Sequence, residues 1–339
     1  MTTATLPADG TTAADGYAAR RRRQLRDGVL VTAAIACLPA LVGSSYLQNV
    51  LILTLMYAAL SQSWNILGGY CGQVSLGHAL YFGVGAYATS VLYVHYGVLP
   101  WGGMLAGGIL AALLAMALGW MCFGLKGHYF SIATLVIAEI ALLLVHNWDF
   151  VGGAMGIQWP IGPDSLATLQ FARNKLPYFY CVLALFALTW VITFVVEGSK
   201  WGYWWRAVKD NTQAAESLGV TVFRSKTAAA ALSAFLTAIG GSFYAAFVAY
   251  IDPDSVMHFR FSLLIVLPTV LGGIGTLWGP LVGAAILIPL TELTRSYMGG
   301  SGSGLDLIIY GALVMAIAIW RSEGIVGYVR GRLERRRNA

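Results

Sequence analysis

Three ionisable side chains lie in strongly apolar surroundings. Glu139 is the only acid well inside an apolar segment, and His78 and His128 also have mainly apolar neighbours. Such residues are costly inside a membrane and are functional candidates by default. Together the three define a less favoured alternative, an intramembrane enzyme. Singly, His78 and His128 are better read as helix-packing residues, whereas Glu139 either pairs with His128, Ser131 or His146 or lines a pathway.

The spacing of these residues argues against catalysis and metal binding. Neither histidine has a second histidine or an acid three or four positions away, as metal ligands on one helix would. Ser75 lies three residues before His78, but no acid follows at a useful place for a triad. A carrier driven by an ion gradient would need a relay of charges, and Glu139 alone makes a poor one. We therefore predict no catalytic residue and no metal site. The four cysteines are far apart and form no CxxC pair.

A glycine-rich stretch from Gly68 to Tyr87, GGYCGQVSLGHALYFGVGAY, surrounds His78. Its first glycines predict a turn, after which the chain re-enters the membrane. Four residues repeat at intervals of four and predict one helix stripe on which small residues let another helix approach: Gln73, Gly77, Tyr81 and Gly85. Gln73 and Ser75 are expected to hydrogen-bond across that contact, and His78 either joins them or faces a pathway.

The elements that must position these residues are apolar helices. Of 339 residues, 58% are hydrophobic and 11% charged, against about 25% charged in a typical soluble domain. Apolar runs long enough to span a bilayer recur along the chain. The sequence predicts an all-α polytopic membrane protein with about ten spans: 29–45, 47–67, 74–96, 101–123, 128–148, 178–197, 227–250, 261–275, 279–298 and 305–321. The eighth is short, holds Pro268 and GGIG, and is expected to be re-entrant or broken.

The distribution of basic residues predicts the orientation. Of the 21 Lys and Arg residues, the predicted external segments hold Arg173, Lys175, Arg260 and Arg295 only. The positive-inside rule then places both termini in the cytoplasm and accounts for the net charge of +6 without nucleic acid as a partner. Glu292 is expected to pair locally with Arg295.

Three regions are expected along the chain. Residues 1–28 form a disordered basic cytoplasmic N-terminus, 29–321 a transmembrane domain, and 322–339 a basic cytoplasmic tail. The domain carries an external loop at 149–177 and a cytoplasmic segment at 198–226. Within that segment, residues 201–218 predict one amphipathic helix that ends at Gly219. This helix is either an interfacial anchor on membrane lipid or a docking element for a cytoplasmic partner.

Five ordered blocks of sequence resemble the permeases of bacterial branched-chain amino acid ABC transporters of the LivM type. They are QVSLGHA with GVGAY (residues 73–87), YFSIATLVIAEI (129–140), GGAMGI (152–157), RAVKDNTQAAESLGV (206–220) and LGGIGTLWGPLVGA (271–284). The resemblance covers about residues 47–320. Permeases for urea and short amides look similar, so these remain the alternative substrates.

The resemblance implies an importer subunit of the bacterial inner membrane. Its partners would be a second homologous permease, two cytoplasmic ATPases and an extracytoplasmic binding protein. The chain has no GxxxxGK[ST] sequence, so ATP would be the cofactor of the partner ATPases and not of this chain. In this family a cytoplasmic loop docks on the ATPase. The corresponding loop of this chain has Gln213 at a position where the family has a Glu. The coupling residues implied are Arg206, Asp210, Gln213, Ala214, Ala215, Glu216 and Gly219.

Overall fold

The computed structural model describes residues 13–41, 43–125, 127–160, 162, 164–171, 174–297, 311 and 324–327. The chain divides into two compact units, residues 1–44 and 45–339. Most of the described residues are helical, which confirms the all-α prediction.

The first unit contains one described helix, α1 (Ala13–Leu41). The expected disorder of residues 1–28 is therefore wrong from residue 13 onward, and residues 1–12 lie outside the described part. The basic stretch AARRRRQLR inside α1 consists of residues with high helix propensity, so it continues the helix instead of ending it. The first predicted span, 29–45, falls mostly on the second half of α1.

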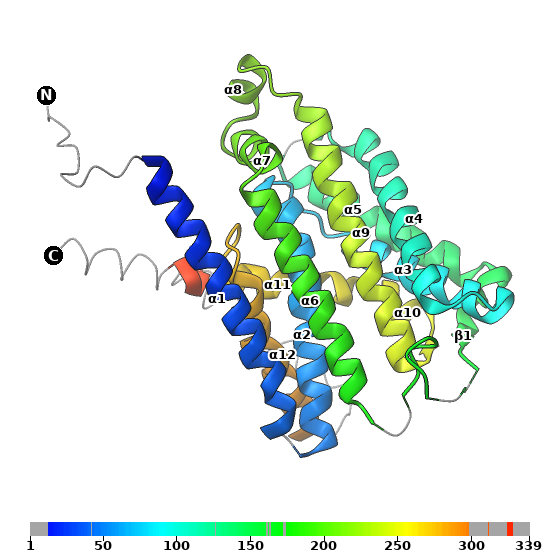
Figure 1. Ribbon diagram of the computed structural model, residues 1–339. Coiled ribbons are helices and arrows are strands. Elements are labelled where there is room, and N and C mark those ends of the chain that lie inside the picture. The colour runs from blue at the N-terminus through cyan, green and yellow to red at the C-terminus, as the bar shows by residue number, and fades with distance from the viewer. Residues whose placement is uncertain are drawn as a thin grey trace, which may run out of the picture. The chain divides into compact units, whose positions relative to one another are not determined.

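The second unit contains the remaining helices (Figure 1). They are α2 (Ser45–Asn65), the π-helical turn η1 (Ile66–Tyr70), α3 (His78–Tyr96), α4 (Pro100–Cys122), α5 (His128–His146), α6 (Leu176–Glu197), α7 (Lys200–Asp210), α8 (Thr212–Ser217), α9 (Val222–Val248), α10 (Pro253–Met257), α11 (Phe259–Gly272) and α12 (Gly279–Tyr297). Two short 3-10 turns, η2 (Asp149–Val151) and η3 (Gly153–Met155), lie in the loop after α5.

Six segments of the described chain are helical, long and apolar enough to cross a membrane: Ser45–Tyr70, α4, α5, α6, α9 and Pro253–Gly272. Nine of the ten predicted spans fall on helices. The tenth, 305–321, lies outside the described residues except for residue 311. A multi-pass membrane protein is thus supported, whereas the count of about ten spans and the cytoplasmic position of both termini stay predictions.

The helix α2 is central to the second unit. It packs against α6, α9, α11 and α12, and 89% of the apolar window in its span is buried. A second packed group consists of α3, α4 and α9, which joins the two groups because it also contacts α2. In contrast, only 22% of the apolar window of α5 is buried, so α5 presents most of its length to lipid or to another chain.

The helices α3 and α9 approach closely at two glycines. A Cβ on Gly85 would collide with the backbone oxygen of Ala238, and one on Gly241 would collide with that of Phe82. The hydroxyl of Ser242 donates to the Gly85 carbonyl at 2.9 Å. The structure thus places Gly85 in a close helix contact of the kind that small residues permit in membranes.

The stretch before α3 is not helical. Residues 71–77 have no regular structure, and α3 begins only at His78. The predicted stripe is therefore wrong for Gln73 and Gly77, which precede the helix. Neighbouring helices cover this backbone: Trp64 donates its indole N–H to the Ser75 carbonyl at 2.8 Å, and Ser131 donates to the Val74 carbonyl at 2.6 Å. Side chains that satisfy freed backbone groups are what a membrane protein needs at an irregular segment.

The loop after α5 is joined to the end of α9 by a small antiparallel sheet. In it β1 (Ile157–Gln158) pairs with β2 (Tyr250–Ile251), Ile157 opposite Ile251 and Gln158 opposite Tyr250. His146 at the end of α5 contacts the Asp254 carboxylate on α10 at 3.2 Å. These contacts fix the loop over one end of the helices.

The helix break predicted at Pro268 within the span 261–275 is not observed, because α11 continues through Pro268 and ends at Gly272. The interruption in this region lies at His258, before the predicted span, and separates α10 from α11. The 14 residues of α11 extend about 21 Å at 1.5 Å per residue, less than the roughly 30 Å of a bilayer core. With α10 included, Pro253–Gly272 reaches 20 residues and the length of a span. A loop at residues 273–278 then leads into α12.

Candidate functional site

The segment between α6 and α9 forms two helices where one was predicted. Asn211 interrupts the helix, with φ −157° and ψ 108°, and its side-chain oxygen accepts a hydrogen bond from the Ala214 N–H at 3.0 Å. Asn is a strong N-cap residue because its side chain satisfies a free N–H of the first turn. Gly219 has φ +82°, the left-handed conformation predicted for the end of this segment.

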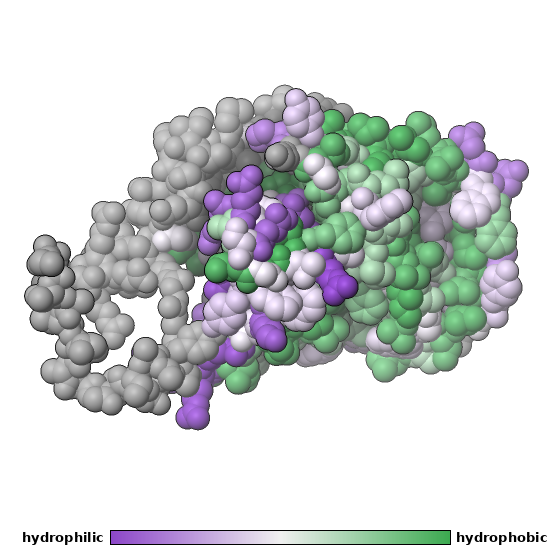
Figure 2. Space-filling model, turned by 90° about the horizontal axis from the view of Figure 1, so that it is seen from above, coloured by the Kyte–Doolittle hydropathy of each residue, from purple (hydrophilic) through white to green (hydrophobic). Residues whose placement is uncertain are grey.

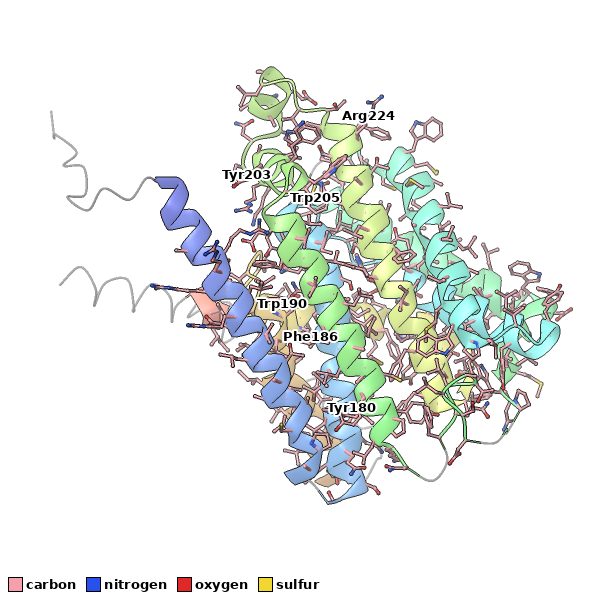
Figure 3. All side chains as sticks on the ribbon, viewed as in Figure 1. Tyr180, Phe186, Trp190, Tyr203, Trp205 and Arg224 are labelled. Carbon is pink, nitrogen blue, oxygen red and sulfur yellow. The ribbon has the colours of Figure 1, made fainter. Side chains whose placement is uncertain are left out.

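One face of this segment is packed onto its own chain. Trp205, Val208 and Ala215 are buried, and the Trp205 indole N–H donates to the Ser225 carbonyl at the start of α9 at 2.9 Å. Figure 3 shows Trp205 between α7 and the first turns of α9. Trp201, in the first turn of α7, is 41% exposed.

The opposite face is exposed. Leu218 is 83% exposed, and the exposed coupling candidates are Asp210, Gln213, Ala214, Glu216 and Gly219. Figure 2, seen from this end, shows hydrophilic residues gathered over it, with hydrophobic residues on the neighbouring flank. Ala215 is 1% exposed. It therefore packs the segment from within and is not part of the surface offered to a partner, which corrects its assignment as a contact residue.

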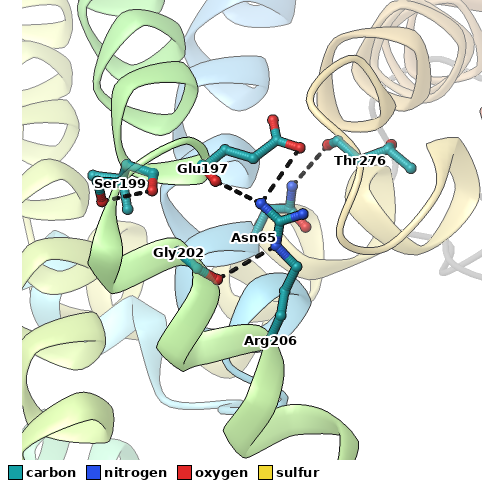
Figure 4. Close-up of polar contacts among 7 residues, drawn as sticks. Asn65, Glu197, Ser199, Gly202, Arg206 and Thr276 are labelled. Carbon is teal, nitrogen blue, oxygen red and sulfur yellow. Dashed lines mark hydrogen bonds and ion pairs between the residues drawn. The ribbon is translucent and has the colours of Figure 1, made fainter. Parts of the chain in front are cut away.

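Arg206 lies on the inner side of α7, against the end of α6. Its Nη2 donates to the Glu197 carbonyl and lies 3.9 Å from the Glu197 carboxylate, and its Nε donates to the Gly202 carbonyl at 3.3 Å (Figure 4). These contacts hold α7 at a set angle to α6. Because the ion pair is partly exposed, its contribution to stability is small, and the main effect of Arg206 is geometric.

A second set of contacts links α7 to the end of α2 and to the 273–278 loop. The Lys209 ammonium donates to the Gly69 carbonyl in η1 at 2.7 Å. The Asn65 amide donates to the Thr276 carbonyl at 2.9 Å and accepts from the Gly275 N–H at 2.8 Å. A π-helical turn such as η1 frequently marks a functional position. The helix α7 is thus hydrogen-bonded to the end of the central helix, and Asn65 joins that end to the loop that leads into α12.

Sequence reasoning did not select Asn65 or Lys209. The signal available for Asn65 was its position at the end of an apolar span, directly before a Gly pair, because polar residues in membrane segments pair with other elements. No local signal identified Lys209, since its acceptor lies 140 positions away in the chain.

His78 is fully buried and belongs to an internal hydrogen-bond chain. Its Nε2 lies 2.9 Å from the Ser233 hydroxyl, which donates to the Ser63 carbonyl at 2.7 Å. The Nδ1 atom is buried and has no hydrogen-bond partner within the described residues. The Tyr81 ring packs edge-on against the imidazole at a centroid distance of 5.5 Å. His78 and Tyr81 thus connect α2, α3 and α9.

The other residues predicted near His78 have local roles. The Ser75 hydroxyl accepts from the Gly77 N–H at 3.3 Å, and the Gln73 N–H donates to the Leu67 carbonyl at 3.0 Å. A Cβ on Gly77 would collide with the backbone oxygen of Thr134 on α5. Gln73, Ser75 and Gly77 therefore form and cover the irregular turn before α3.

Glu139 is partly exposed on α5 and makes no hydrogen bond or ion pair with the described residues. Two of its expected partners are engaged elsewhere: Ser131 donates to Val74, and His146 contacts Asp254. In the described chain no hydrogen bond or ion pair joins Glu139 to His78 or to His128. The residues for an intramembrane enzyme are therefore not joined by such a contact. The expected ion pair between Glu292 and Arg295 stays a prediction, because the Arg295 side chain lies outside the described part of the chain.

The cysteines do not form a reactive cluster. All four are free thiols, and no three His, Cys, Asp or Glu side chains of the described residues are grouped as metal ligands. Cys71, in the turn after η1, is fully buried. Burial raises the pKa of its thiol to about 12, and the charge of Lys226 offsets this only in part.

Comparison with known proteins gives a match over most of the chain. Residues 46–318 match the family described as branched-chain amino acid transport system / permease component. The high-affinity branched-chain amino acid transport system permease protein LivM of Escherichia coli K12 is 27% identical over 314 residues, covering 86% of this chain and 72% of that protein. LivM of Salmonella typhimurium is 26% identical, covering 84% of this chain and 71% of the relative.

A second kind of relative is more distant. LivH of Salmonella typhimurium, also a high-affinity branched-chain amino acid permease protein, is 22% identical over 289 residues, covering 80% of this chain and 91% of that protein. No solved structure matches the chain.

Proposed function

Since this chain belongs to the permease component family of branched-chain amino acid transport systems, we propose that it is a membrane subunit of an ATP-driven importer of these amino acids. The observation that carries the proposal is the family match over residues 46–318, and the exposed face of α7 and α8 inside that match supports it. The family is one of transport permeases.

Separate ATPase subunits would supply the energy. No P-loop sequence occurs in the chain, so ATP must be bound elsewhere if transport is active. The exposed face of α7 and α8, which includes Asp210, Gln213, Glu216 and Leu218, would sit in a groove on an ATPase. Its acids argue against a surface that serves anionic lipid alone.

The contacts beneath α7 suggest how a movement of the ATPases would reach the membrane. Arg206 ties α7 to α6, Trp205 ties it to α9, and Lys209 ties it to the end of α2. A force on α7 would therefore act on three spans at once. Tilting of these spans would switch access between the two sides of the membrane.

A second permease would complete the pathway. Both LivM and LivH are similar to this chain, which supports pairing between two homologous permeases. The poorly buried α5, with the partly exposed Glu139, offers a surface for that partner. An extracytoplasmic binding protein would deliver the substrate to the loop between α5 and α6, and the inner membrane of a bacterium would be the location.

Uptake by the reconstituted complex tests this function. Both permeases and the ATPases are placed in proteoliposomes with the binding protein, and radiolabelled leucine, valine, alanine and urea are offered with and without ATP. We expect ATP-dependent uptake of leucine and valine and none of urea. Uptake of leucine at the same rate without ATP or without the ATPases would overturn the proposal, and uptake of urea alone would assign the alternative substrate class.

A further inference from the structure

A small cavity with two charged walls lies at the end of the bundle opposite α7 and α8. It has a volume of about 270 Å³ and lies among α2, α9, α10, α11 and α12. In Figure 1, α7 and α8 lie at the upper end, whereas α10 and the first turns of α2 lie toward the lower one. The lower end is the external side in the predicted orientation, so the cavity faces the side from which an imported substrate arrives.

The charges in the lining have opposite sign. Arg260, at the start of α11, and Glu292, near the end of α12, both line the cavity. Arg260 is exposed and Glu292 is half-buried. The Glu292 backbone carbonyl accepts a hydrogen bond from the Tyr46 hydroxyl at 3.0 Å, which holds this wall against the start of α2. A guanidinium recognises a carboxylate through paired N–H donors, and a carboxylate accepts from an ammonium.

The rest of the wall is mainly aliphatic and aromatic. The remaining lining consists of three aliphatic, three aromatic and two hydroxyl side chains: Leu53, Leu264 and Ile288; Tyr57, Tyr244 and Phe261; Ser255 and Thr291. An α-amino acid with a branched aliphatic side chain combines a carboxylate, an ammonium and an apolar group. The volume of about 270 Å³ is near the roughly 300 Å³ at the lower end of small-molecule sites, which suits one amino acid and excludes a peptide.

The larger cavity in the same unit lacks this chemistry. It has a volume of about 630 Å³ between α4, α6, α9 and the loop before α6, and no charged side chain lines it. A zwitterion moved into that space would leave both of its charges unpaired, which is strongly unfavourable. Of these two cavities, the small one has a charged side chain of opposite sign for each charge of the zwitterion.

We propose that the Arg260–Glu292 cavity binds the amino acid zwitterion on its way through the permease, with Arg260 toward the carboxylate, Glu292 toward the ammonium and Leu53, Leu264 and Ile288 around the side chain. The proposal rests on the proposed function and deepens it. It favours amino acids over urea or amides because a neutral substrate would form no charge pair with Arg260 or with Glu292.

Saturation-transfer NMR on the detergent-solubilised permease complex, without binding protein or ATP, tests the cavity directly. The probes are leucine, isoamylamine, which lacks the carboxylate, and 4-methylpentanoate, which lacks the ammonium. Wild type is expected to bind leucine best of the three. Arg260→Gln and Glu292→Gln are each expected to weaken leucine binding by about tenfold, since each removes one charge pair.

The variants are also expected to change selectivity in opposite ways. Arg260→Gln should lose the preference for leucine over isoamylamine, and Glu292→Gln the preference over 4-methylpentanoate. The control Asp254→Asn removes a charge from α10 at a position that does not line the cavity, and it should keep both preferences. If the two residues had only a structural role, the two variants would not each lose a different preference.

Two results would overturn the cavity assignment: equal binding of the three probes to wild type, or unchanged leucine preferences in both variants. The wild-type comparison needs no substitution, so it decides the matter even if a variant does not fold. ATP-dependent leucine uptake by the wild-type complex is measured separately. Uptake without cavity binding would refute this site and keep the importer function, whereas absence of uptake would refute the function itself.

Discussion

Leu218 offers the sharpest test of the docking surface. It is a large apolar side chain that is 83% exposed at the end of α8, so it contributes very little to the stability of the folded chain. Full burial of a leucine side chain stabilises by about 1.5–3 kcal/mol. If an ATPase groove covers Leu218, truncation to Ala should cost the complex most of that, or about 1–2 kcal/mol, after allowance for the methyl group that remains.

This energy corresponds to roughly a tenfold rise in the Kd between the ATPase subunit and the permease complex. The Kd is measured by titrating labelled ATPase onto the detergent-solubilised permeases. ATP-dependent leucine uptake should fall at limiting ATPase concentration and recover at high concentration. The thermal stability of the isolated permease should stay within about 0.5 kcal/mol of wild type, as for a surface substitution.

Two further variants make this result specific. Leu125→Ala removes the same groups from a residue that is 41% exposed in the turn after α4, on the same predicted face, and should leave the Kd unchanged. Leu218→Met keeps the apolar volume and should restore docking. An unchanged Kd for Leu218→Ala would refute the reasoning, since an exposed leucine inside a docking groove cannot be neutral.

Three further predictions concern the interior. Lys209→Met keeps the aliphatic length but loses the hydrogen bond to the Gly69 carbonyl, which is worth about 0.5–1.5 kcal/mol. ATPase docking should therefore persist while the amount of leucine imported per ATP hydrolysed falls. An unchanged ratio would exclude this link. Gly85→Val forces a Cβ against the Ala238 carbonyl and should lower the free energy of unfolding by about 1–3 kcal/mol, as measured by thermal unfolding. The control Gly124→Ala has open space around its Cβ and should leave that free energy unchanged. Burial raises the pKa of Cys71 to about 12, so its thiol stays protonated at pH 8. In a variant whose other cysteines are replaced by Ser, Cys71 should therefore resist maleimide while the protein is folded. Labelling before unfolding would contradict its burial.

The helices themselves were predictable from local pattern. Apolar runs of span length predicted nine segments that fall on observed helices, because a membrane helix must satisfy its own backbone and be apolar along its whole length. The end of the coupling segment at Gly219 was predictable for a similar reason, since its φ of +82° suits glycine. Prediction failed where local signals competed. Residues 1–28 were expected to be disordered, but arginines with high helix propensity belong to α1. One helix was expected over residues 201–218, but the Asn211 cap divides it into α7 and α8.

The burial of individual residues was not predictable in the same way. Ala214 and Ala215 are adjacent and alike, yet Ala215 is buried and Ala214 is exposed. Gln73 continued a four-residue repeat but precedes the helix, because Trp64 and Ser131 bind the backbone of the turn and hold it out of helical form. Such outcomes depend on residues far away in the chain.

The sequence by itself determined the class of molecule: an all-α multi-pass membrane protein of the branched-chain amino acid permease family, with a polar segment at 198–226. Composition, apolar run length and ordered motifs are local properties, and the chain carries them before it folds. The tertiary structure alone decided which polar groups meet. Lys209 reaches Gly69, and Arg260 and Glu292 come to share one small cavity, because helix packing brings together side chains that local sequence leaves unrelated.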